Sequence, residues 1–224
     1  MATYKDLCID AVDPATMAPF WQATLGLEAD PDGVGRVTHL TGPTEQHGAW
    51  INQVPEPVSV KQRVHIDVHA ASTDEVLARG ATPEDLESFR WDVLRDPDGG
   101  ELCVFTRDEV PSYRLYEIVV DSADPFEVAK WWHGVLGGEL GGDHEHGWAW
   151  LDQLPLVPFE NIVFVQVPEP KTAKNRIHWD VDVDDVQRLL DHGASLIRAP
   201  DEDISWHVLA DPEGNEFCAF APPE

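Results

Sequence analysis

Residues 63–67 read RVHID, and residues 176–180 read RIHWD. Nearly the same spacing brings back three other segments, which are VPEP (54–57 and 167–170), FWQATLG as WWHGVLG (20–26 and 131–137) and DPDG as DPEG (96–99 and 211–214). Self-similarity at one period indicates a duplicated structural unit. The chain is therefore predicted to hold two copies of one module, residues 1–110 and 113–224.

The composition bounds the class of protein. The chain has 224 residues, of which 42% are hydrophobic, and this is enough for one large domain or for two modules. Its 15 Lys and Arg face 42 Asp and Glu, which gives a net charge of −27. Such a charge disfavours binding to nucleic acid or to anionic lipid, and it favours neutral or cationic partners.

The N-terminal residues and the cysteines both favour a cytoplasmic protein. Residues 1–10 carry Lys5, Asp6 and Asp10 and do not resemble a secretory signal, and no run approaches the roughly 20 apolar residues of a membrane span. Cys8, Cys103 and Cys218 form no CxxC pair, so neither a disulfide framework nor a structural zinc knuckle is indicated. We expect a cytoplasmic protein whose three cysteines are buried and unreactive.

Within each module, the same order of strand-like and helix-like patterns occurs twice. Residues 3–10 alternate between apolar and polar, as a half-buried strand does. Asp13 and Asp124 then precede a proline and an apolar stripe that ends at Gly26 or Gly137, the pattern of a capped helix. Further strands are expected at 36–40, 49–54, 89–94, 102–105, 115–120, 148–154, 161–167, 205–209 and 217–220, and short helices at 73–78 and 184–191. Each module thus reads as two βαβββ units, which predicts an α+β fold with mixed sheets.

This order, together with FWQATLG, RVHIDV and DPEGNEF, resembles the vicinal oxygen chelate superfamily. Within that superfamily the chain looks like the glyoxalase-like and bleomycin-resistance proteins, and the likeness covers nearly the whole chain twice. The resemblance implies that the two βαβββ units of each module form one curved mixed sheet around a cleft. In metal-using members, four strands of this sheet each supply one ligand.

Carried onto this sequence, the resemblance implies a set of ligands in each module. They are Asp6, Gln53, His65 and Glu101 in the first module, and Glu117, Gln166, His178 and Glu216 in the second. The usual last ligand is a glutamate, but its position holds Cys103 or Cys218, so the glutamates two residues earlier would have to replace it from about 6.8 Å along the strand.

Such ligands suit one Mn²⁺, Fe²⁺, Ni²⁺ or Zn²⁺ per module, which would act as a Lewis acid. The alternative is a chain without metal, in which His65 and His178 only form hydrogen bonds with neighbouring polar groups such as Asp67 and Asp180.

Nine tryptophans are a high load for this length. Trp21, Trp131 and Trp132 lie on the helix stripes and are expected in the core, and Trp179 has the opposite parity to His178, so it should lie under a helix. Five more are expected on strands that shape the cleft, where rings bind ligands by stacking and cation–π contacts: Trp50, Trp91, Trp148, Trp150 and Trp206. Ordinary packing is the alternative for these five.

Two functions are consistent with these patterns. The first is a binding protein that captures a neutral or cationic aromatic compound, as drug-sequestering relatives do. The second is a divalent-metal-dependent enzyme of the lyase, isomerase or dioxygenase type, acting on a substrate with adjacent oxygens. Either would be a monomer of two modules or a homodimer, with a small molecule as its partner and neither nucleic acid nor membrane.

Overall fold

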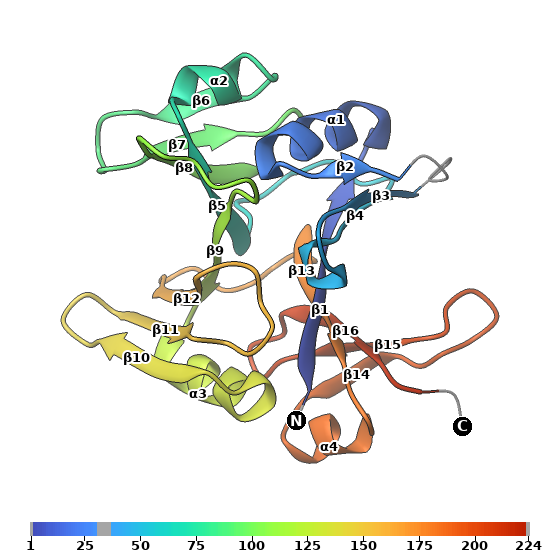
Figure 1. Cartoon of the computed structure of the whole chain (residues 1–224). Coiled ribbons are helices and arrows are strands. Elements are labelled where there is room, and N and C mark those ends of the chain that lie inside the picture. The colour runs from blue at the N-terminus through green and yellow to red at the C-terminus, as the bar shows by residue number, and fades with distance from the viewer. Residues whose placement is uncertain (1, 31–36, 223–224) are drawn as a thin grey trace.

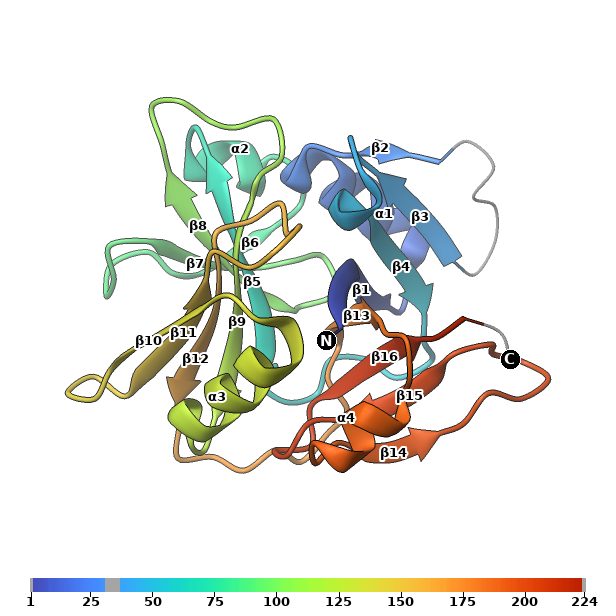
Figure 2. The ribbon, with the colours of Figure 1, turned by 60° about the horizontal axis from the view of Figure 1, so that its bottom comes forward.

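The structure is a computed structural model that describes residues 2–30 and 37–222. Two eight-stranded mixed sheets make up most of it (Figures 1 and 2). Sheet A contains, in spatial order, β14 (Ser195–Arg198), β15 (His207–Ala210), β16 (Glu216–Phe220), β13 (Ile177–Asp182), β1 (Thr3–Ala11), β4 (Ala49–Gln53), β3 (Val37–Thr41) and β2 (Glu28–Ala29). The α+β class with curved mixed sheets is confirmed. Arg36, where one strand was expected to begin, lies outside the described residues.

Sheet B repeats this arrangement with the other two units. It contains, in spatial order, β10 (Glu139–Asp143), β11 (Trp148–Asp152), β12 (Asn161–Gln166), β9 (Leu115–Ser122), β5 (Val64–Ala70), β8 (Glu101–Thr106), β7 (Asp92–Arg95) and β6 (Thr82–Asp85). The central strands β1, β5, β9 and β13 are almost wholly buried, because they have a neighbour on both sides.

Each sheet is assembled across the two modules, so the expectation that the two units of one module form one sheet is wrong. β1 pairs antiparallel with β13, and β5 pairs antiparallel with β9, so each sheet takes one βαβββ unit from each module. Figure 1 shows β13 beside β1 and β9 beside β5. The reason lies in the connections. The short linker 107–114 keeps β8 and β9 in one sheet, whereas the loops 54–63 and 167–176 cross between the sheets.

Two long helices begin and end where the sequence predicts. The side chain of Asp13 accepts a hydrogen bond from Ala15 N (3.1 Å) at the start of α1 (Pro14–Leu25). Asp124 accepts one from Glu127 N (3.2 Å) at the start of α3 (Pro125–Leu136). Both helices end at a glycine with positive φ. The remaining helices are short: η1 (Glu45–His47), α2 (Thr73–Leu77) and α4 (Gln187–Asp191).

The core lies on the helix-covered faces of the sheets. Trp21, Trp131 and Trp132 are buried, as expected. The Trp132 ring in α3 lies 4.7 Å from the ring of Trp179 in β13, so the prediction that Trp179 lies under a helix is confirmed. Because α3 also packs on β11 and β12 of sheet B, it joins the two sheets into one core. Among the described residues, no helix is long and apolar enough to span a bilayer.

Candidate functional site

On sheet A, the face turned away from the core carries a buried polar cluster. β1 contributes Asp6 and Cys8, β13 contributes His178 and Asp180, and β16 contributes Cys218. These positions alternate with core residues, because successive side chains on a strand point to opposite faces. The register places Cys8 opposite His178, and Asp180 beside Cys218. We call these five residues the sheet A cluster.

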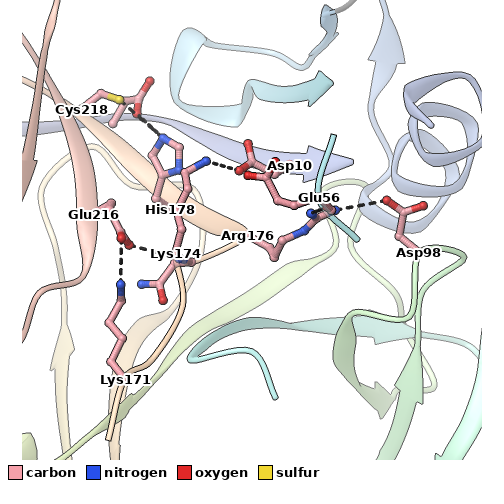
Figure 3. A network of polar contacts seen from close by, with 11 residues as sticks. Asp10, Glu56, Asp98, Lys171, Lys174, Arg176, His178, Glu216 and Cys218 are labelled. Carbon is pink, nitrogen blue, oxygen red and sulfur yellow. Dashed lines mark hydrogen bonds and ion pairs between the residues drawn. The ribbon is translucent and has the colours of Figure 1, made fainter. Parts of the chain in front are cut away.

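Three donor groups of the sheet A cluster lie close enough to share one ligand. One donor atom each from Cys8, His178 and Asp180 lies within 4.8 Å of the others. Cys8 Sγ is 3.5 Å from Asp180 Oδ2, and His178 Nε2 is 3.4 Å from Asp180 Oδ1. The Cys218 thiol lies 3.5 Å from the same His178 nitrogen (Figure 3). His178 Nδ1 and Asp180 Oδ1 are buried and have no hydrogen-bond partner among the described residues, so this cluster has unused bonding capacity.

Asp6 extends the cluster toward the N-terminal end of β1. Its Oδ2 accepts hydrogen bonds from Lys5 Nζ (2.7 Å) and Trp50 Nε1 (2.9 Å), while its Oδ1 is buried without a partner. Burial and the nearby negative charge of Asp180 raise the pKa of Asp6 to about 6. The carboxyl group of Asp6 is therefore partly protonated in weakly acidic solution.

Sheet B carries an equivalent cluster with one thiol fewer. Donor atoms of His65, Asp67 and Cys103 lie within 4.8 Å of one another. Glu117 lies opposite Asp67 in the register, and Val119 occupies the position that Cys8 has in sheet A. His65 Nδ1 and Asp67 Oδ1 are buried without a hydrogen-bond partner among the described residues. We call His65, Asp67, Cys103 and Glu117 the sheet B cluster.

Local charge sets the protonation of the sheet B cluster. Burial lowers the pKa of His65, but the contact with Asp67 and the charges of Glu101 and Asp121 outweigh it and raise this pKa above its usual value. Burial also raises the pKa of Glu117, whose Oε1 accepts a hydrogen bond from Asn161 Nδ2 (2.8 Å). His65 is thus favoured as the cation among carboxyl groups.

A β-bulge in each sheet directs one carboxyl group, that of Asp6 or Glu117, toward its cluster. The register between β1 and β13 shifts between Tyr4 and Leu7, and the register between β5 and β9 shifts beside Glu117. A bulge inserts one extra residue and re-aims the side chains next to it. Asp6 and Glu117 lie at these equivalent bulges, which sequence periodicity does not reveal.

The structure does not bring all the expected ligands together. Gln53 pairs with Ala11, and Gln166 pairs with Ser122, so both glutamines have the parity of the core face and both are exposed at strand ends. Glu216, the first residue of β16, accepts hydrogen bonds from Lys171 Nζ (2.8 Å) and Asn175 N (3.1 Å). Its carboxylate therefore binds the loop 167–176 rather than the sheet A cluster. Glu101 is half-buried on the face that carries Cys103.

The grouping of the ligands by module is also wrong. The sequence grouped Asp6 with His65, and Glu117 with His178. Because β1 pairs with β13, Asp6 lies with His178, and Glu117 lies with His65. Cys8, Asp67 and Asp180 were not assigned as ligands. Strand parity could have indicated them, because each lies two residues from an expected ligand and therefore on the same face of the strand.

The thiols at the clusters are buried, as predicted from the sequence. Burial raises the pKa of Cys8, Cys103 and Cys218 well above the usual value, and nearby carboxylates add to this effect. The free thiols therefore carry their protons at neutral pH, and a metal ion would have to displace a proton in order to bind one.

Aromatic side chains continue outward from the sheet B cluster. Trp91 stacks between Phe89 (ring centroids 5.1 Å apart) and Phe105 (5.4 Å), and Phe105 lies 5.0 Å from the Tyr116 ring. The guanidinium carbon of Arg107 lies 5.6 Å from the Phe105 centroid and 5.4 Å from that of Tyr116. We call Phe89, Trp91, Phe105 and Tyr116 the sheet B aromatic row.

The other expected tryptophans have separate positions. Trp50 in β4 stacks on His39 (3.9 Å), and Trp206 stacks on Phe220 (5.3 Å). Trp91 and Trp206 each lie one residue before a strand rather than within it, which corrects their expected placement. Trp148 and Trp150 lie on β11, toward the β10 edge of sheet B.

Comparison with known proteins agrees with this architecture. The profile of the glyoxalase-like domain family matches residues 6–105 and again residues 117–220. Glyoxalase I from Zea mays has a similar structure, with a TM-score of 0.63 and 13% identity over 99% of this chain and 92% of that one. The cppA protein from Streptococcus pneumoniae is similar with a TM-score of 0.51 and 10% identity, over 99% of this chain and 100% of that one.

A search of curated proteins finds no match. At these identities the two solved structures support the fold alone. The two profile matches together cover most of the chain, so the chain belongs to the glyoxalase-like domain family, with two copies of that domain in tandem.

Proposed function

We propose that this chain captures a small neutral or cationic aromatic compound at the sheet B aromatic row, as a binding protein of the glyoxalase and bleomycin-resistance type. One observation carries the proposal: the stack of Phe89, Trp91 and Phe105, in which Phe89 is 54% exposed. Stacked rings with an accessible face bind flat ligands at low entropic cost. We place this activity in the cytoplasm, whose reducing conditions suit three free cysteines.

Charge supports a cationic ligand. The chain carries a net charge of −27, and Glu117 lies beside Tyr116 at the inner end of the row. Negative potential raises the local concentration of a basic compound and speeds its association.

The test uses an aminoacridine cation as the aromatic probe and measures its affinity by titration calorimetry. Trp91→Leu should raise the dissociation constant by about three- to tenfold, because an aromatic pair contributes about 0.5–1.5 kcal/mol beyond its buried area. Trp148→Leu is the matched control, since Trp148 is 40% exposed but lies on the other half of sheet B. Equal affinity in Trp91→Leu and the unmodified protein would refute the proposal.

A second function is favoured by the polar clusters. We propose that the sheet A cluster holds a divalent ion, with Cys8, His178 and Asp180 as its ligands. Thiolate, imidazole and carboxylate together suit Zn²⁺ better than the hard ions. The proposal is supported by the buried Asp180 Oδ1, which has no hydrogen-bond partner among the described residues and lies 3.4 Å from His178 Nε2. A bound ion would supply Lewis-acid polarisation of a substrate with adjacent oxygens.

Metal analysis tests this second proposal. Protein purified without chelators should bind Zn²⁺ at the sheet A cluster, and Cys8→Val should lose this ion. This variant is matched within the chain itself, because Val119 occupies the equivalent position in sheet B. His178→Ala should have the same effect as Cys8→Val. Unchanged zinc stoichiometry in both variants would refute the site.

A further inference from the structure

A cavity of about 600 Å³ lies away from both clusters, between the loops 54–63 and 167–176. These loops join β4 to β5 and β12 to β13, and they meet at the ends of β1 and β9. The two repeats line the cavity with equivalent positions, from Glu56 to Arg63 and from Glu169 to Arg176. Its volume falls within the roughly 300–1,000 Å³ of small-molecule sites.

The two loops hold each other in place across the cavity. Arg63 Nη1 donates to Glu169 O (2.5 Å), and its Nη2 donates to Asp121 O (3.0 Å). Arg176 makes the equivalent contact with Glu56 O, and its Nη2 donates to Asp98 Oδ2 at 3.3 Å (Figure 3). The terminal nitrogens of both arginines therefore fix the walls of the cavity, while Arg63 Nε and Arg176 Nε are buried without a hydrogen-bond partner among the described residues.

Two lysines offer unused donors to this cavity. Lys61 Nζ contacts Asp121 Oδ2 (2.5 Å), and Lys174 Nζ contacts Asp10 in the equivalent way (Figure 3). Both carboxylates are buried, whereas the lysine side chains are 53% and 50% exposed. An ammonium group has three donors, of which the carboxylate takes one. The buried aspartates thus hold two ammonium groups at the cavity with donors free for a ligand.

The rest of the lining determines the kind of ligand. Val58, Val60 and Ala173 present apolar surface. Four cations of the lining (Lys61, Arg63, Lys174 and Arg176) balance its four carboxylates (Asp10, Glu56, Asp121 and Glu169), so the cavity lacks the strong negative charge of the chain as a whole. The exposed carboxylates of Glu56 and Glu169 would still repel a ligand with several negative charges. We propose that this cavity binds an organic monoanion with an apolar body, a carboxylate or sulfonate whose oxygens accept hydrogen bonds from Lys61 or Lys174 while its body packs on Val60 and Ala173.

Anilinonaphthalene sulfonate, a monoanion with an apolar body, is the probe, and its fluorescence on titration gives the affinity. Lys61→Gln with Lys174→Gln should weaken binding by about tenfold or more, the effect of losing roughly 1.4 kcal/mol of binding free energy. The control removes two exposed cations that lie outside the cavity, Lys130→Gln with Arg198→Gln, and should leave the affinity unchanged. A drop of the same size in the control would overturn the proposal.

A second variant removes no charge. Ala173→Trp places a large side chain in the cavity, so it should abolish probe binding even if the lysine variant fails to fold because Asp10 and Asp121 lose their partners. Aminoacridine binding at the sheet B aromatic row should persist in Ala173→Trp, which separates this site from the one proposed above. Full affinity for anilinonaphthalene sulfonate in Ala173→Trp would show that the anion binds elsewhere and would overturn the proposal.

Discussion

Asp96 illustrates how one buried carboxyl group makes stability depend on pH. It is 5% exposed in the turn after β7, where its Oδ1 accepts hydrogen bonds from the backbone N–H groups of Asp98 (2.9 Å) and Gly100 (2.8 Å). Burial outweighs these bonds and raises the pKa of Asp96 to about 6. The folded state therefore binds this proton more tightly than the unfolded state, in which the pKa is about 3.9.

From this shift we predict that the free energy of unfolding falls as the pH rises from about 4 to about 6, by up to about 3 kcal/mol from Asp96. In that window the folded chain holds a proton that the unfolded chain releases. Asp96→Asn should reduce the slope without abolishing it, because Asp6 also has a pKa of about 6. Urea denaturation at several pH values measures the slope.

Asp201→Asn is the control for this pH dependence. The hydrogen bonds from Arg198 lower the pKa of Asp201 to about 2, so its proton is lost well below pH 4 in the folded chain. This variant should keep the slope between pH 4 and pH 6. An unchanged slope in Asp96→Asn would contradict the assignment.

At the residue scale, part of the site follows from the sequence. His65 and His178 stand out because they lie in the repeated RVHID and RIHWD segments, and both lie in the clusters. Gln53 was misplaced because the register of β4 is set by its pairing with β1, where Trp50 lies beside Cys8. The sequence does not show at which residue β4 begins after the preceding loop, so its side-chain parity relative to β1 could not be counted along the chain.

Helix capping gives a prediction at the scale of one element. Asp124 accepts a hydrogen bond from Glu127 N at the start of α3, the helix that packs on both sheets. Asp124→Ala should lower the free energy of unfolding by about 1 kcal/mol, the usual cost of losing such a cap. Urea denaturation measures it, with the exposed Glu139→Ala as control. A loss no larger than that of the control would show that this cap contributes nothing.

The strands that sequence analysis did not locate share one property. β2, β6, β10 and β14 are the edge strands of the two sheets, and each follows a helix. An edge strand is half-solvated and short, so it carries no clear alternation of apolar and polar residues, and it tolerates proline and glycine. β6 contains Pro83, and β10 contains Gly141 and Gly142. The central strands β1 and β9, which are buried on both faces, lie within two residues of their expected bounds, 3–10 and 115–120.

For the whole molecule, the sequence predicts four βαβββ units but not which units share a sheet. The units repeat one apolar pattern, so a unit can bury the same face against either neighbour. The choice depends on contacts that the crossing loops make, such as Lys61 with Asp121 of β9 and Arg63 with Glu169 of the other loop. These contacts join residues far apart in the chain, and periodicity carries no information about them.

A division of the chain tests this assembly. Residues 1–110 and 113–224, produced together as separate chains, should co-purify as a one-to-one complex, because each sheet needs a unit from both. Either half alone should self-associate or aggregate, since the edges of β1 and β5 would lose their partners β13 and β9. Light scattering after size-exclusion chromatography distinguishes these results. Two halves that are each folded and monomeric, and that do not bind each other, would contradict the prediction.

The most direct test is the proximity of Cys8 in the first module to His178 in the second, because both the sheet pairing and the sheet A cluster depend on it. Nuclear Overhauser effects between backbone hydrogens of the intact, isotope-labelled chain measure this proximity. We predict cross-peaks that join Cys8 to His178 and its strand neighbours, with none between β1 and β5 along their lengths. Cross-peaks that pair Cys8 with His65 instead would place both clusters within single modules and contradict the assembly described above.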